Sequence, residues 1–243
     1  MPAQETGNSI LISLMCNILL VLGKGIAGLL ANSNALVADA IHSLTDVSAF
    51  LINYRACSDC QLYRRIDKDR SSERISQRLA ETELRATCYT GMVFLTTGIA
   101  ICLYNLMILV LGKVERPDSI TVLVALVALA VYAALYKYLG GASPIVMEAC
   151  MLTGRNAHWQ NKMNLLSGTA VVVGLSGSML GFSALDELAA VVVGSILVAM
   201  GAKLIIEIGQ RLSGGLKEHL RLAVFSSILV SIALAAISLA IRL

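Results

Sequence analysis

The chain has 243 residues, of which 57% are hydrophobic and only 14% charged, and its mean hydropathy is +0.76. Soluble domains carry about 25% charged residues, so this composition excludes an ordinary soluble domain. The formal net charge of +3 is too small to predict nucleic-acid binding. Long apolar runs, rather than short alternating ones, predict an all-α polytopic membrane bundle and argue against a β-barrel.

The apolar runs follow one another along the chain, and each is about as long as a spanning helix needs to be. They occupy 9–31, 34–54, 84–111, 119–140, 160–181, 185–208 and 220–241. The first run is long enough to span and residues 1–8 lack a basic region, so we expect no separate signal peptide. The sequence therefore predicts a short N-terminus at 1–8, a transmembrane domain at 9–212 and a C-terminal extension at 213–243 with an extra helix.

Small residues recur within the first and sixth runs, where they would let neighbouring helices approach closely. They are Gly23, Gly28 and Ala31 in the first run, and Gly194, Gly201 and Ala202 in the sixth.

The distribution of Lys and Arg predicts the orientation in the membrane. The connection at 55–83 is rich in arginine, whereas the turn at 31–33 has no charge. Because positive charge accumulates in cytoplasmic loops, 55–83 is expected in the cytoplasm and 31–33 outside. The N-terminus is then cytoplasmic and a seventh span places the C-terminus outside.

Within this connection, residues 61–83 have the pattern of a polar amphipathic helix of mixed charge. One interpretation is a solvated extension of the third helix, and the other is a docking surface formed by its arginines. Cys57 and Cys60 form a CxxC pair, which is suited to zinc or redox chemistry. A single CxxC is also often incidental, and both interpretations stay open.

The second run contains three ionisable residues, Asp39, His42 and Asp46, at spacings of three and four. These spacings place them on one helix face. Charged groups at bilayer depth are costly and normally face a partner, a cavity or an ion path. His42 and Asp46, one turn apart, are suitable ligands for a divalent transition metal. A buried hydrogen-bonded pair that fixes helix packing is the alternative.

The sequence SNALVADAIHSLTD, residues 33–46, resembles the second-helix signature of the cation diffusion facilitators. That resemblance implies a six-helix, usually dimeric exporter that exchanges zinc, manganese, iron or a related divalent ion for protons. It implies metal-ligand roles for His42 and Asp46, while Asp39 matches a common position that is not a ligand. The partners it implies are the lipid bilayer, the metal ion and protons, with a homodimer or a heterodimer.

The same family has a second half-site on its fifth helix, His and Asp one turn apart, usually after Trp. Aligning Ser167 and Gly174 with the family pattern places Gln160 and Asn164 at these two ligand positions. Trp159 agrees with this alignment. A slipped alignment would instead pair His158 with Lys162, which puts a lysine in a ligand position.

The amides at Gln160 and Asn164 are neutral, hard ligands that suit Mn²⁺, Mg²⁺ or Ca²⁺ better than zinc. The protein charge no longer balances a dication unless Asp39 rotates in as a further ligand. The resemblance also implies a mixed α/β C-terminal domain, for which the residues after Gly215 are too few and too apolar.

Two functions follow from these observations. The first is transport of a divalent cation, with no resident cofactor. The alternative is a transport-inactive scaffold or partner subunit of a heterodimer. No phosphate-binding loop, HExxH motif or nucleophile–base pair occurs in the sequence, so we do not expect an enzyme.

Overall fold

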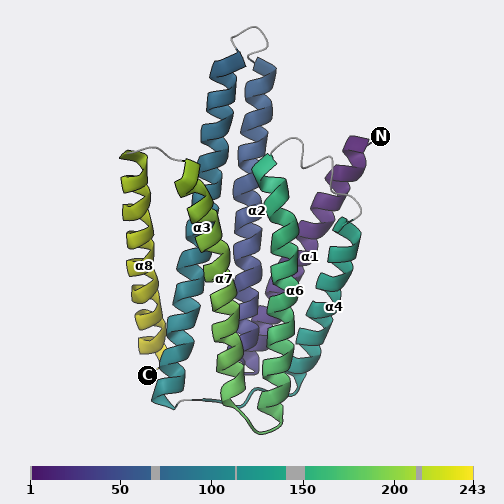
Figure 1. Cartoon of the computed structure of the whole chain (residues 1–243). Helices are drawn as coiled ribbons and strands as arrows, with labels where there is room; N and C mark the ends of the chain where they lie inside the picture. Colours follow the sequence, from purple (N-terminus) through teal and green to yellow (C-terminus); the bar gives the residue numbers. More distant parts are fainter. Residues whose placement is uncertain (1, 67–71, 113, 141–150, 212–214, 243) are drawn as a thin grey trace.

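The computed structural model describes residues 2–66, 72–112, 114–140, 151–211 and 215–242. These residues form seven α-helices and no strand, and they run side by side as a bundle (Figure 1). The helices are α1 (Pro2–Leu30), α2 (Asn34–Ile66), α3 (Ser72–Leu111), α4 (Ile120–Gly140), α6 (Met151–Met179), α7 (Ala184–Arg211) and α8 (Gly215–Arg242). The predicted all-α bundle is confirmed, and every predicted run lies within a helix apart from its end residues.

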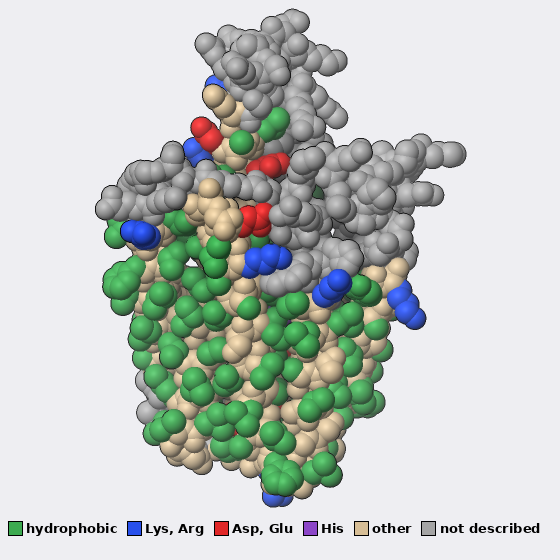
Figure 2. All heavy atoms as spheres, in the orientation of Figure 1, with side chains coloured by type: hydrophobic (Ala, Val, Ile, Leu, Met, Phe, Trp, Pro, Cys, Tyr) green, Lys and Arg blue, Asp and Glu red, His purple; other side chains and the backbone are tan. Residues whose placement is uncertain are grey.

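The surface of the bundle is suited to lipid. Segments long and apolar enough to cross a membrane occur in α2, α3, α4, α7 and α8, and α1 has a shorter apolar stretch, Leu14–Leu30. Many large apolar side chains are exposed. Figure 2 shows them covering most of the described bundle, with Lys and Arg mainly toward the end that carries the N-terminus. The chain is therefore an integral multi-pass membrane protein.

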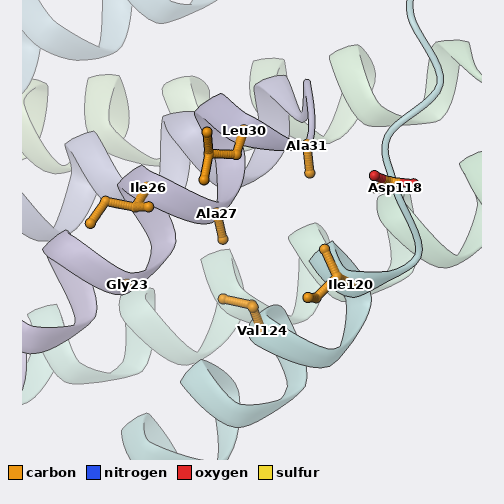
Figure 3. A pocket seen from close by; sticks show the side chains of 8 residues that line it. All are labelled: Gly23, Ile26, Ala27, Leu30, Ala31, Asp118, Ile120 and Val124. Atoms are coloured by element: carbon orange, nitrogen blue, oxygen red, sulfur yellow. The ribbon is translucent and has the colours of Figure 1, made fainter.

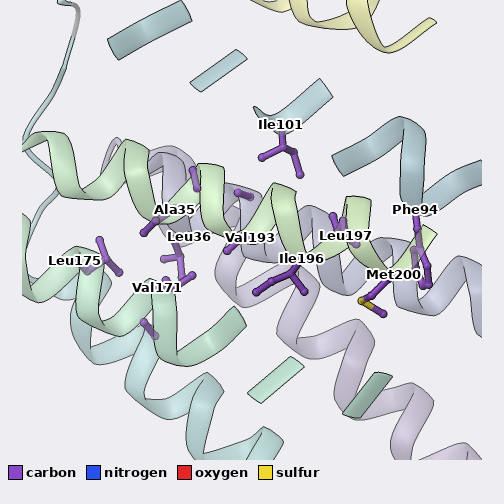
Figure 4. Close-up of a cluster of buried hydrophobic side chains, with 14 of the residues drawn as sticks. Ala35, Leu36, Phe94, Ile101, Val171, Leu175, Val193, Ile196, Leu197 and Met200 are labelled. Carbon is purple, nitrogen blue, oxygen red and sulfur yellow. The ribbon is translucent and has the colours of Figure 1, made fainter. Parts of the chain in front are cut away.

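The core lies between α2, α3, α6 and α7 (Figure 4). Leu36, Phe94, Leu175, Val193 and Leu197 are its members with almost no exposed surface. In water, burying such a side chain would stabilise the fold by roughly 1.5–3 kcal/mol. Lipid is as apolar as these side chains and provides no such hydrophobic drive between helices. Close van der Waals packing therefore decides how these helices associate.

Glycines set the closest helix approaches. A Cβ on Gly98 of α3 would lie 2.6 Å from the Gly194 carbonyl oxygen of α7, and one on Gly201 would lie 2.6 Å from the Leu95 nitrogen. A Cβ on Gly28 would be 2.9 Å from the Val37 nitrogen. The predicted role of small residues is confirmed at Gly28, Gly194 and Gly201, whereas Gly98 was not predicted. It is wrong at Gly23, where no atom lies within 4 Å of an added Cβ.

The interpretation of residues 61–83 as an extension of the third helix is confirmed from Ser72 onward and is wrong for residues 61–66. Residues 61–66 continue α2, and the residues from Ser72 onward belong to α3. The two helices project together beyond the rest of the bundle as an antiparallel pair (Figure 1). The polar pattern therefore belongs to the ends of two long helices, because a helix that leaves the membrane exchanges apolar for charged side chains without breaking its backbone hydrogen bonds.

Helix α8 lies along α3. The Ser231 hydroxyl donates to the Thr96 carbonyl oxygen at 2.8 Å, and the Ser227 and Thr96 hydroxyls also contact each other. Such contacts satisfy polar groups that lipid cannot. The apolar segment at 220–241 is thus a member of the bundle, and residues 215–242 do not form a mixed α/β domain.

Candidate metal site

The three predicted residues of α2 lie on one buried face. Asp39 and His42 are each 2% exposed as whole residues, and the side chain of Asp46 is 11% exposed. They face the interior because α2 packs against α1, α3, α6 and α7, which covers this stripe on every side. Ser33, before the first turn, and Asp186 of α7 hold the start of the helix, through a hydroxyl–carboxylate hydrogen bond of 2.8 Å.

The His42 and Asp46 side chains face each other at a distance longer than a hydrogen bond. His42 Nε2 lies 3.9 Å from Asp46 Oδ2. Nε2 and both Asp46 oxygens are buried and make no hydrogen bond of normal geometry with the described part of the chain. Two ligands of one tetrahedral ion with bonds of about 2 Å are roughly 3.3 Å apart, so a small rotation of either side chain would let both bind one ion.

Helix α6 supplies the opposite wall. Asn164 is 6% exposed, and its side chain interacts with the Asp46 carboxylate, although its Oδ1 makes no hydrogen bond. Ser167, three residues further on, lies 3.1 Å from His42 Nδ1 through its Oγ. The face of α6 that includes Asn164 and Ser167 therefore meets α2.

The alternative alignment of α6 is disfavoured because Lys162 is exposed and does not lie on the face with Asn164. Gln160 is one turn before Asn164 on α6, but its side chain and that of His158 lie outside the described residues. The Gln160 ligand role thus stays a prediction, and so do those of Asn164 and Asp39.

Asp39 has a partner that the sequence analysis does not predict, Lys24 of α1. The Lys24 Nζ lies 2.8 Å from Asp39 Oδ2 and 3.1 Å from the Asp39 carbonyl oxygen. It also donates to Tyr132 Oη at 2.8 Å and to the Ser43 hydroxyl. Only 1% of Lys24 is exposed. A lysine within an apolar run is a signal that could have identified this residue, since such a charge needs a partner in the membrane.

Few ionisable side chains of the described residues lie at this site. Among the described residues no cluster of three or more His, Cys, Asp or Glu could hold a metal. The buried groups that face one another here are the His42 imidazole, the Asp46 carboxylate and the Asn164 amide, while the Lys24 ammonium neutralises Asp39.

Two other features do not contribute to this site. A cleft of about 380 Å³ between α1 and α4 is lined by Gly23, Ile26, Ala27, Leu30, Ala31, Asp118, Ile120 and Val124. Figure 3 shows its largely apolar walls, and neither His42 nor Asp46 lines it. The CxxC side chains, Cys57 and Cys60, lie outside the described residues, although both positions are in α2.

Comparison with known proteins agrees with this geometry. A model of the cation efflux transmembrane domain matches residues 10–213. Magnetosome protein MamB of Magnetospirillum gryphiswaldense is 29% identical over 196 residues, which are 78% of this chain and 60% of that protein. MamB of Magnetospira sp. strain QH-2 is 26% identical over 190 residues, 76% of this chain and 59% of that protein.

A plant protein, Metal tolerance protein C1 of Arabidopsis thaliana, is 26% identical over 220 residues, 83% of this chain and 44% of that protein. The chain thus spans three fifths or less of the length of these relatives. The domain match covers most of the chain, and it includes every residue of the buried α2–α6 site. The chain therefore belongs to the cation efflux family, the cation diffusion facilitators, which are transporters rather than enzymes.

Proposed function

We propose that the chain binds a divalent metal cation between α2 and α6 and carries it across the membrane in exchange for protons. One observation carries this proposal: His42 Nε2 and the Asp46 carboxylate are buried, face each other at 3.9 Å and make no normal hydrogen bond. Buried polar atoms are nearly always satisfied, so three buried atoms without a normal hydrogen bond in a cation efflux domain fit a binding site for an ion.

The ligand set supports a hard dication as the cargo. Asn164 provides an amide oxygen, and Gln160 is the fourth ligand that the sequence alignment predicts. Because Lys24 neutralises Asp39, the net protein charge at the site is about −1, which comes from Asp46. We therefore expect Mn²⁺ or a similar ion to bind better than Zn²⁺.

A membrane orientation and an assembly complete the proposal. We infer a cytoplasmic N-terminus from the arginine-rich connection at 55–83. We infer a homodimer, or a heterodimer with another cation efflux protein, from the family resemblance.

The alternative is a subunit that does not transport by itself. It is favoured by the neutral Asn164 opposite Asp46 and by the lack of any third His, Cys, Asp or Glu that could join His42 and Asp46 among the described residues. In that case an intact family member in a heterodimer would carry the ion.

Flux into proteoliposomes tests the proposal. The purified chain should transport at least one of Mn²⁺, Zn²⁺, Fe²⁺ and Co²⁺, with release of protons detected by a pH-sensitive dye. His42→Ala and Asp46→Ala should abolish this flux, whereas Glu115→Ala, which removes an exposed acid, should not change it. Absence of flux for all these metals, or flux insensitive to both site substitutions, would contradict transport at this site. Recovery of flux only with a co-purified partner would support the alternative.

A further inference from the structure

A chain of buried polar contacts connects α1 to the metal-facing imidazole. It consists of Lys24 on α1, Asp39 and His42 on α2, and Ser167 on α6, all of them 2% exposed or less. Neither Lys24 nor Ser167 is a metal-ligand candidate. The arrangement of protons along this chain determines which nitrogen of His42 is free.

In the first contact, both carboxylate oxygens of Asp39 accept hydrogen bonds. Its Oδ2 lies 2.8 Å from the Lys24 ammonium, and its Oδ1 lies 2.9 Å from Ser167 Oγ. An ammonium can only donate, so the Asp39 carboxylate accepts on Oδ2, and its Oδ1 faces the Ser167 hydroxyl as a second acceptor. In the contact between Asp39 and Ser167, the serine must therefore be the donor.

The second link fixes His42. A serine hydroxyl has one proton, and the Ser167 proton is directed to Asp39. In the 3.1 Å contact between His42 Nδ1 and Ser167 Oγ, the oxygen can only accept, so Nδ1 carries the hydrogen. The neutral ring then has its lone pair on Nε2, the atom that faces Asp46 at 3.9 Å.

We propose that Lys24, Asp39 and Ser167 form a positioning relay that holds His42 as the Nδ1–H tautomer, with Nε2 aimed at the cation position beside Asp46. The proposal rests on the proposed function for the identity of the ion, but the tautomer can be measured without any metal. It also makes Asp39 a positioning residue rather than a ligand, since both its oxygens are engaged in the relay.

The relay has a defined energetic purpose. A ligand histidine usually donates its second nitrogen's proton to a polar group, and loss of that partner typically weakens metal binding 10–100-fold. If the Ser167 hydroxyl proton could turn toward Nδ1, the serine would donate to the imidazole and would no longer accept its proton. The Asp39 carboxylate prevents this turn by accepting the serine proton, and the Lys24 ammonium holds the carboxylate in place.

The tautomer is tested by ¹⁵N NMR of ring-labelled histidine. The chain has three histidines, so His158→Gln and His219→Gln leave His42 as the single signal. In metal-free protein at a pH where the ring is neutral, we expect protonated Nδ1 and unprotonated Nε2. Ser167→Ala should shift the population toward Nε2–H, and Ser167→Thr, which keeps the hydroxyl, should restore the Nδ1–H form. Ser178→Ala, a buried serine elsewhere on α6, is the matched control.

Equilibrium dialysis with Mn²⁺ and Co²⁺ gives the second measurement. Ser167→Ala should weaken binding about 10–100-fold, while Ser178→Ala should leave it unchanged and Asp46→Ala should abolish it. An Nε2–H ring in the parent protein, or a tautomer and an affinity that Ser167→Ala leaves unchanged, would overturn the relay. If the tautomer shifts as expected but no variant binds either metal, the relay stands and the proposed function fails.

Discussion

At the residue scale, the buried Lys24–Asp39 pair separates two carboxylates that look alike in the sequence. Asp39 and Asp46 are on the same face of α2, but only Asp39 has an ammonium 2.8 Å away. Asp46 has the His42 imidazole and the Asn164 amide as neighbours. The first carboxylate is thereby satisfied within the protein, whereas the second makes no hydrogen bond of normal geometry with the described residues.

Removal of Lys24 should destabilise the protein through this pair. Lys24→Met leaves a buried Asp39 anion without its cation, which costs about 3–5 kcal/mol for a pair of this kind. Adding Asp39→Asn removes the anion and should recover much of the loss. Thermal unfolding in one detergent would measure both, with exposed Lys137→Met as the control. A double variant no more stable than Lys24→Met would show that the pair is not the cause.

Restoring a carboxylate at Asn164 should strengthen the site. Asn164→Asp adds a second anion opposite His42 and Asp46, and the affinity of oxygen-ligand sites for a hard dication such as Ca²⁺ depends on the charge of the ligands. We expect Mn²⁺ to bind about tenfold or more tightly, measured by equilibrium dialysis beside the parent chain. Asn164→Ala, which removes the amide oxygen, should change affinity in the opposite direction. Equal affinities in the three proteins would place the ion away from α6.

At the element scale, the position of a helix depends on hydrogen bonds from neighbouring helices. Asp186 and Glu187 are at the start of α7, where acids suit the helix dipole. In the structure the Asp186 carboxylate instead accepts hydrogen bonds from the Asn34 nitrogen at 2.6 Å and the Ala35 nitrogen at 3.3 Å. It caps α2 from a neighbouring helix, and so sets the position of the helix that carries His42.

The α3–α7 interface should be sensitive to a single methyl group. Gly98→Ala places a Cβ 2.6 Å from the Gly194 carbonyl oxygen and 2.7 Å from the Val198 nitrogen, and neither backbone atom can move alone. We expect a lower unfolding temperature in detergent for Gly98→Ala. Gly23→Ala, with no atom within 4 Å of the new Cβ, should be neutral or slightly stabilising, because alanine favours helix over glycine. Similar effects at the two sites would argue against close packing of α3 on α7.

At the scale of the whole molecule, the bundle places chain segments at two ends. The N-terminus and the α2–α3 connection lie at one end, whereas the α1–α2 turn, the α3–α4 loop and the end of α8 lie at the other (Figure 1). This is the pattern that the Lys and Arg distribution predicts, with the arginine-rich connection opposite the uncharged turn. Which end is cytoplasmic stays a prediction.

Thiol labelling of intact cells would establish the orientation. In a background without the native cysteines, Glu81→Cys on α3 and Glu115→Cys in the α3–α4 loop introduce thiols at two exposed positions. A membrane-impermeant maleimide should label Glu115→Cys in intact cells and Glu81→Cys only after lysis. The reverse pattern would place the N-terminus outside, and labelling of both from one side would contradict the bundle topology.

Much of this architecture could be predicted from sequence alone, because each apolar segment forms a helix in lipid whatever its neighbours are. Apolar runs predict where the described helices lie, although α6 is not among those apolar enough to span by length and composition. The SNALVADAIHSLTD signature indicates the family and places His42 and Asp46 on one face. The extension of α3 back to Ser72 could be predicted, but the continuation of α2 over residues 61–66 could not, since a polar amphipathic pattern suits either helix.

The sequence by itself determined the membrane class, the helices, the family and the two ionisable groups that face each other. Only the tertiary structure decided that Asp39 belongs to Lys24, that Ser167 contacts His42, and that Asn164 rather than Lys162 faces α2. The reason is physical. Hydropathy is a property of each segment. Whether a buried charge is satisfied depends instead on which side chains of three different helices lie within a few ångströms of one another.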